Sequence, residues 1–226
     1  MKRTILLLLS LLSLVAKAQE TQIIGGYLLD GKDSFEELDA AVLTESDSKE
    51  KTLDGKGMRL PGGYIFMTPE NVGEEIGSIV NTRHPFLVRT ISFTVEENRM
   101  EGCRASIRIY RLHDEDNPVN IVTLPIYQDI PKAAGKTTFS IAPEESIVLD
   151  PGKYYISFSL TEIGQEIKDR WADSDSWDKK EHFTKYKQDR IFFPAYFKDS
   201  YNRDNPERPL AKWGMNIGLS IKGKRI

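Results

Sequence analysis

The feature that most limits the fold of this chain is a hydrophobic pattern with a period of two, which runs from about residue 60 to the C-terminus. In 87–95 and 154–160, apolar side chains take nearly every second position, with polar, small or amphipathic ones between them. Shorter stretches with the same period lie at 106–110, 122–126, 139–141, 147–149, 191–197 and 215–221. This spacing is typical of β-strands that place one face on a core and the other in water.

Turn-forming residues separate these stretches at 98–102, 114–118, 131–135 and 150–152. The last of these, Asp150-Pro151-Gly152, is a strong turn signal, because proline presets φ and glycine tolerates positive φ. Pro125 indicates an edge strand or a bulge in the 122–126 stretch, since proline cannot donate to a strand ladder. Many short strands without helices between them predict an all-β fold, an antiparallel β-sandwich of jelly-roll-like type, over residues 60–226.

Two stretches do not follow the alternation. Residues 33–60 are acidic and rich in turns, and Ser34-Phe35-Glu36-Glu37 resembles a capping box before a short helix. The alternative, two irregular strands, is the one we favour, so residues 19–59 are expected to form an irregular or β segment. Residues 163–189, called the insert from here on, are highly charged and are expected to be partly helical. A long connection of this kind is either functional or disordered.

The first 18 residues have the pattern of a signal peptide. Lys2 and Arg3 precede an apolar run, and Ala16-Lys17-Ala18 places small residues at the −3 and −1 positions of a cleavage site. The run is too short to span a bilayer, and no run of about 18 apolar residues follows it. We therefore expect an exported protein, periplasmic, on the outer surface or secreted, with no membrane span after cleavage.

Charge argues against a nucleic-acid partner. The chain has a formal net charge of −3, and removing residues 1–18 takes away three basic and no acidic side chains, which leaves −6. Nucleic-acid binding favours a clearly basic footprint. The basic tail Lys222-Gly223-Lys224-Arg225 carries too few charges to hold nucleic acid at physiological salt.

The aromatic residues of the insert are the first candidates for a binding site: Trp171, Trp177, Phe183 and Tyr186. Exposed aromatic rings on β-sandwich proteins are suited to stacking on sugars or anchoring a protein partner. The alternative is that the insert folds back and uses the same rings as a satellite core.

Three carboxylates of the insert, Asp173, Asp175 and Asp178, are candidates for a Ca²⁺ site, because Ca²⁺ prefers oxygen ligands. Measured from Asp173, however, the positions where an EF-hand has glycine and glutamate are Asp178 and Thr184. A solvated acidic turn or helix start is the alternative. No cofactor is expected.

Catalytic patterns are missing from the sequence. It has no Gly-x-Ser-x-Gly and no His-Glu-x-x-His, and its three histidines are far apart in the chain. Cys103 is the single cysteine, which rules out an intramolecular disulfide and indicates a semi-buried strand thiol. We therefore assign no catalytic residue and expect a protein that is not an enzyme.

Several segments resemble a group of uncharacterised secreted β-sandwich proteins of Bacteroidetes, of the Bacteroides and Prevotella type. They are 71–78 running into Pro85-Phe86-Leu87-Val88, then 107–111, 152–155, 191–194 and 216–219. The resemblance covers roughly residues 60–226 and implies the fold and the export. Relatives often carry an upstream carboxypeptidase-regulatory-like module, of which 38–60 resembles a shortened remnant.

Together these observations predict a secreted or envelope-associated, non-enzymatic binding module for a glycan or a protein. Two alternatives remain open: a structural component of the cell envelope or its surface assemblies, and a polysaccharide or peptide hydrolase. A hydrolase requires two carboxylates facing each other across a cleft, with pKa values that differ.

Overall fold

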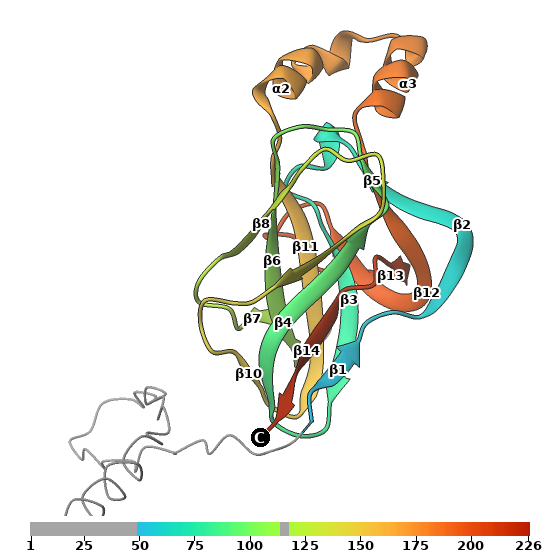
Figure 1. The fold of residues 1–226 in the computed structure, drawn as a ribbon. Coiled ribbons are helices and arrows are strands. Elements are labelled where there is room, and N and C mark those ends of the chain that lie inside the picture. The colour runs from blue at the N-terminus through green and yellow to red at the C-terminus, as the bar shows by residue number, and fades with distance from the viewer. Residues whose placement is uncertain (1–48, 114–117) are drawn as a thin grey trace, which may run out of the picture. The chain divides into compact units, whose positions relative to one another are not determined.

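The computed structural model describes residues 49–113 and 118–226. The expected signal peptide, the capping box at Ser34 and most of the 19–59 segment lie outside these residues, as does most of the turn expected at 114–118. The described part forms an antiparallel β-sandwich of two sheets, with short helices in the insert (Figure 1). The all-β fold and the partly helical insert expected from the sequence are thereby confirmed.

In the described residues, the larger sheet has nine strands and includes the path β13-β12-β3-β11-β6-β7, with β2 and β5 paired to β12 and β8 paired to β6. The bounds are β2 Met58–Met67, β3 Glu75–Thr82, β5 Glu97–Asn98, β6 Cys103–Leu112, β7 Pro118–Asn120, β8 Ile126–Ile130, β11 Gly152–Glu162, β12 Ile191–Arg203 and β13 Ala211–Asn216. A short 3₁₀ helix, η1 at Pro69–Asn71, connects β2 to β3.

The smaller sheet has five strands in the described residues, in the order β1-β14-β4-β10, with β9 also paired to β4. The bounds are β1 Lys51–Asp54, β4 Phe86–Val95, β9 Thr137–Ile141, β10 Val148–Leu149 and β14 Ser220–Arg225. β1 and the first two residues of β2 precede residue 60, so part of the stretch expected to be irregular or β pairs with strands of the sandwich. The short, largely exposed β1 lacks the alternation that marks the later strands.

The insert lies at one end of the sandwich, between β11 and β12 (Figure 1). It contains α2 at Gln165–Trp171, the 3₁₀ turn η2 at Ser174–Ser176 and α3 at Lys179–Gln188. Asp178 caps α3, where its side chain accepts hydrogen bonds from the backbone amides of Lys180 and Glu181. Glu181 completes a capping box, so the charged sequence of the insert contains a genuine helix start.

The main core lies between the two sheets. Ile107 and Phe158 on the larger sheet and Ile91 and Phe93 on the smaller one are all essentially inaccessible to solvent. The Phe93 and Phe158 rings meet edge to face with their centroids 5.3 Å apart. The burial of apolar surface stabilises the sandwich, and edge-to-face contacts between aromatic rings contribute beyond that burial.

The outer face of the larger sheet differs from the expectation. The period of two predicts that Tyr155, Ser157 and Ser159 face water, but all three are buried. A second hydrophobic cluster covers this face, in which Tyr155 packs with Tyr201 and with Leu210 from the β12–β13 connection. These residues are buried because the chain after β12 folds back over this face of the sheet. The alternating pattern of the strands is compatible with either a covered or a solvent-exposed outer face.

Two predicted strands are also corrected. In 122–126 the strand starts only at Ile126, after Pro125, as β8. The stretch 215–221 is divided between β13 and β14, which belong to different sheets. Gly218, with φ of 74°, lies at the crossing point, and this left-handed conformation suits glycine because it has no Cβ.

Candidate functional site

The aromatic residues of the insert form a compact group, here called the insert cluster: Trp171, Trp177, His182 and Tyr186. The two indole rings are 5.1 Å apart, and His182 stacks on Tyr186 at 5.6 Å. Trp171 is only 7% exposed and belongs to the main core together with Ile167. Its ring faces are therefore occupied by packing, and the cluster joins the insert to the sandwich.

Of the other predicted site residues, Phe183 is the most exposed, at 60%, and Lys187 lies over its ring at 4.3 Å. Trp177 and Tyr186 are half-buried. The structure thus brings Trp171, Trp177 and Tyr186 together, whereas Phe183 faces away from them into solvent. These four residues do not form one exposed platform.

The three aspartates of the insert are used separately. Asp178 caps α3, the backbone carbonyl of Asp173 accepts a hydrogen bond from Ser176, and Asp175 is exposed. Within 49–113 and 118–226, no three histidine, cysteine, aspartate or glutamate side chains are grouped to hold a metal ion. The arrangement therefore corresponds to the helix-start interpretation of this stretch.

A cleft of about 320 Å³ lies where the insert meets the sandwich. Its apolar wall contains Trp171, Ile163 and Val72, and its rim carries Glu70 and Glu162 together with Lys168. Glu70 is hydrogen-bonded to His182 at 2.8 Å, which connects η1 to α3 across this junction. This volume is at the lower end of the range typical of small-molecule sites.

A pair of exposed aromatic rings beside the insert was not predicted from the sequence. On β2, Tyr64 and Phe66 are 51% and 41% exposed, while Ile65 and Met67 between and after them are buried. Phe192 on β12 lies between them, with ring centroids 6.0 Å from Tyr64 and 6.5 Å from Phe66. The alternation in 64–67 could have revealed these outward rings, but the Pro61-Gly62-Gly63 interruption hid this strand.

Three arginines lie against these rings. Arg59 is 5.7 Å from the Tyr64 ring, Arg99 is 5.0 Å from Phe192, and Arg190 is 4.5 Å from Phe192. We call the six residues the aromatic–arginine face: Tyr64, Phe66, Phe192, Arg59, Arg99 and Arg190. It is continuous with the insert cluster, because the Phe66 and Tyr186 rings meet edge to face at 5.7 Å.

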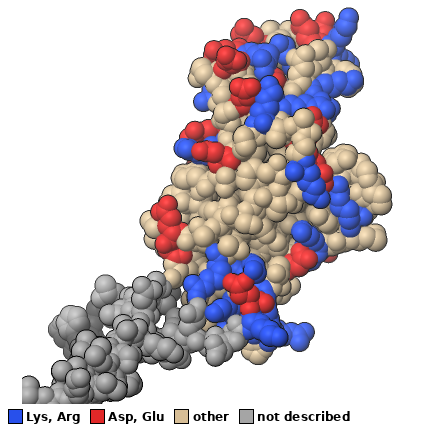
Figure 2. All heavy atoms as spheres, in the orientation of Figure 1, with Lys and Arg blue, Asp and Glu red and all other residues tan. Residues whose placement is uncertain are grey.

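The neighbouring insert, unlike the aromatic–arginine face, carries many charged side chains of both signs. Figure 2 shows Lys, Arg, Asp and Glu side chains of both signs gathered over α2 and α3, above a mostly uncharged middle of the molecule in this view.

Aromatic rings and stacked arginines are the residue types enriched in protein interfaces. The aromatic–arginine face has the composition of such an interface.

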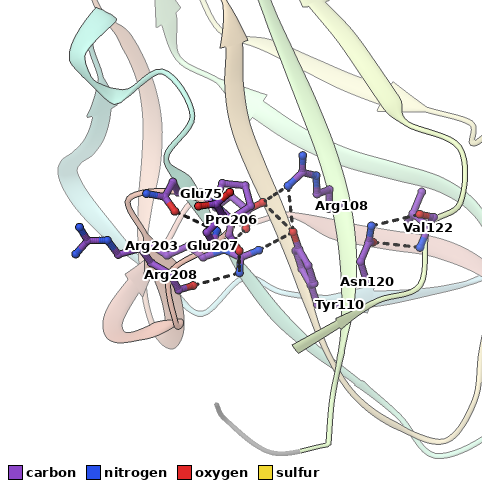
Figure 3. Close-up of polar contacts among 10 residues, drawn as sticks. Glu75, Arg108, Tyr110, Asn120, Val122, Arg203, Pro206, Glu207 and Arg208 are labelled. Carbon is purple, nitrogen blue, oxygen red and sulfur yellow. Dashed lines mark hydrogen bonds and ion pairs between the residues drawn. The ribbon is translucent and has the colours of Figure 1, made fainter. Parts of the chain in front are cut away.

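A buried network of charged and polar side chains lies on the larger sheet and is shown in Figure 3. The Glu75 side chain is inaccessible to solvent and accepts hydrogen bonds from Arg108 at 3.0 Å, Tyr110 at 2.9 Å and Arg203 at 2.7 Å. Arg203 also donates to the carbonyl of Pro206 at 2.8 Å. Glu75 therefore anchors the loop after β12 over the sheet.

The same network is unsuited to acid–base chemistry. Both oxygens of Glu75 are engaged by donors, whereas a catalytic base must reach the proton it abstracts. Burial raises the pKa of Tyr110, and hydrogen bonding to Tyr110 raises the pKa of Arg108. Cys103 is likewise buried, and burial raises its thiol pKa to about 12, which removes nucleophilic character at neutral pH.

Fold and surface together define an all-β sandwich with an aromatic and cationic face beside a helical insert. In comparisons with known proteins, the chain matches neither a family model nor a curated protein. Among the described residues, no helix has the length and apolar character needed to cross a bilayer.

Proposed function

We propose that this chain is an exported, non-enzymatic binding module that holds a partner protein on its aromatic–arginine face. The observation that carries the proposal is the pair Tyr64 and Phe66, two neighbouring large rings that are about half exposed on an ordered strand. Displaying such rings to water is unfavourable, and contiguous apolar surface of this kind marks interaction sites.

A protein partner fits this surface better than a glycan. Sugar stacking requires an open ring face, but of the two indoles of the insert Trp171 is 7% exposed and Trp177 is half-buried and packed against it. The exposed rings are instead Tyr64 and Phe66, and they lie beside the half-buried Phe192, which two guanidinium groups cover. Protein interfaces use this combination as energetic hot spots.

The test places a photo-crosslinking residue, p-benzoylphenylalanine, at position 64 or 66 in the producing cell. Position 127 is the matched control, because Tyr127 is 53% exposed on a different strand and also has an arginine, Arg104, 6.0 Å from its ring. We expect one protein to crosslink at 64 and 66 and not at 127. Equal adducts at all three positions would contradict a specific face.

The crosslinked protein is then purified and its affinity measured. We expect it to bind wild type and Tyr127→Ala equally, and Tyr64→Ala/Phe66→Ala at least about tenfold more weakly, as for removal of hot-spot residues. Circular dichroism checks that the double variant folds. Binding of a purified glycan that the double variant loses would favour the glycan alternative, and a crosslinked envelope assembly would favour the structural one.

A further inference from the structure

Arg190 differs from the other arginines around the aromatic–arginine face. Arg59 is paired with Glu96 at 3.3 Å, Arg99 with Glu97 at 2.7 Å, and Arg170 with Asp189 at 2.6 Å. Arg190 forms no ion pair with any residue that the structure describes, and its Nε is buried without a hydrogen-bond partner there.

Aromatic rings hold the Arg190 guanidinium in place. Its central carbon is 4.5 Å from the Phe192 centroid and 5.5 Å from the Phe66 centroid. Burial lowers the pKa of Arg190, and the neighbouring positive charge of Arg99 lowers it further. The charged form is therefore less well compensated here than at the other arginines, although a guanidinium keeps its proton at any physiological pH.

Arg99 is the neighbouring positive charge that acts on Arg190. The Lys187 carbonyl accepts a hydrogen bond from Arg99 at 2.8 Å, whereas the ammonium group of Lys187 lies over the Phe183 ring. Glu97 offsets one of these charges through its bond to Arg99, which lowers the pKa of Glu97. Arg99 and Glu97 thus form a pair, and the positive charge of Arg190 is left over, on a chain whose formal net charge is −3.

We propose that Arg190 is the anchor for an acidic side chain of the partner protein, and that an apolar residue next to that side chain packs on Phe66 and Tyr64. A carboxylate is the group that a guanidinium held flat by aromatic stacking binds best, because two parallel N–H donors match two oxygens. The inference rests on the proposed function and specifies its partner as an acidic segment with an adjoining apolar residue.

The experiment selects random peptides displayed on phage against the full mature chain, without using any variant in the selection. Arg104→Gln is the matched control, because Arg104 also lies beside a tyrosine ring but has its own carboxylate, Asp129, at 2.7 Å. Synthetic peptides from the selection are labelled, and their affinities are measured by fluorescence polarisation. Melting temperatures of all chains are recorded alongside.

We expect the selected peptides to contain aspartate or glutamate beside an aromatic or aliphatic residue. They should bind wild type and Arg104→Gln equally, and Arg190→Gln at least about tenfold more weakly, a change of about 1.4 kcal/mol. Changing the acidic residue of the peptide to its amide should lower its affinity for wild type by a similar factor. The same change should affect its affinity for Arg190→Gln little. Arg190→Lys keeps the positive charge but removes the planar pair of N–H donors, so it should also bind these peptides more weakly than wild type, and it provides the test if Arg190→Gln does not fold.

Peptides without acidic residues, or with equal affinity for wild type and Arg190→Gln, would overturn the role of Arg190. If such peptides still lose affinity for Tyr64→Ala/Phe66→Ala, the proposed function stands and only the acidic anchor is wrong. If neither variant affects any selected peptide, both proposals are contradicted.

Discussion

The indole Nε1 of Trp171 donates a hydrogen bond of 2.8 Å to Oδ2 of Asp189, which joins the end of α2 to the residue after α3. Arg170 binds the same carboxylate through two nitrogens, at 2.8 and 2.6 Å. Asp189 is 3% exposed, so these bonds close the base of the insert away from water. The insert is thus held to the sandwich by its polar base as well as by its aromatic rings.

Replacing Asp189 with asparagine is expected to destabilise the helices of the insert while the sandwich stays folded. The amide keeps one acceptor but loses the charge that faces Arg170, and hydrogen bonds to charged groups contribute roughly 1.5–3 kcal/mol. Hydrogen exchange should show lost protection in α2 and α3 while β6 and β11 remain protected. Asp169→Asn is the control, since the Asp169 carboxylate accepts a hydrogen bond from the exposed Gln165 side chain at the surface. Equal effects of the two changes would contradict this role of Asp189.

Replacing Glu75 with glutamine is expected to lower the free energy of unfolding by about 3–5 kcal/mol, because it leaves the buried Arg203 without its carboxylate. Chemical denaturation measures the change. Asp129→Asn is the control, because it removes an exposed partner of Arg104, and an ion pair that water screens contributes little to stability. A Glu75→Gln chain as stable as Asp129→Asn would show that the network in Figure 3 contributes little.

Cys103 is expected to be unreactive in the folded chain at pH 8. Burial raises its thiol pKa to about 12, so almost none of it is thiolate, and the thiolate is the reactive form. Ellman's reagent should therefore react only after denaturant is added. Rapid reaction of the folded chain would mean that the thiol is accessible.

The same shift predicts a loss of stability at high pH. Between the ordinary thiol pKa near 9 and the folded value of about 12, the unfolded chain binds fewer protons than the folded one. The free energy of unfolding therefore falls as the pH rises through this range. Burial also raises the pKa of Tyr155, which acts in the same direction. Denaturation curves recorded at pH 8 and above measure the slope, and a Cys103→Ala chain should show a smaller one.

Gly77 in β3 is expected not to tolerate alanine. A Cβ there would lie 2.0 Å from the Ile156 carbonyl oxygen on the paired strand β11. Relieving this overlap requires the strands to separate, at a cost of roughly 1–3 kcal/mol or more. Gly135→Ala is the control, because a Cβ at Gly135 meets nothing within 4 Å. Similar melting temperatures for the two variants would contradict the close approach of β3 and β11.

Local patterns were sufficient for some of these features. The alternation in 154–160 predicts β11, and the charged insert between β-strands predicts helical structure, because both depend on residues near in sequence. The role of Trp171 in packing was one of two open alternatives. A period of two assigns side chains to faces of a strand, but it does not reveal what covers each face.

The amino-acid sequence by itself indicated several strands, such as β4 and β11, and which of their residues share a face. Only the tertiary structure decided that Tyr155 is buried beneath the chain after β12, and that Tyr64 and Phe66 remain open beside Arg190. These outcomes depend on contacts between residues far apart in the chain, such as Glu75 with Arg203 and Phe66 with Phe192. Long-range pairing fixes them, because the same local pattern is compatible with burial or exposure.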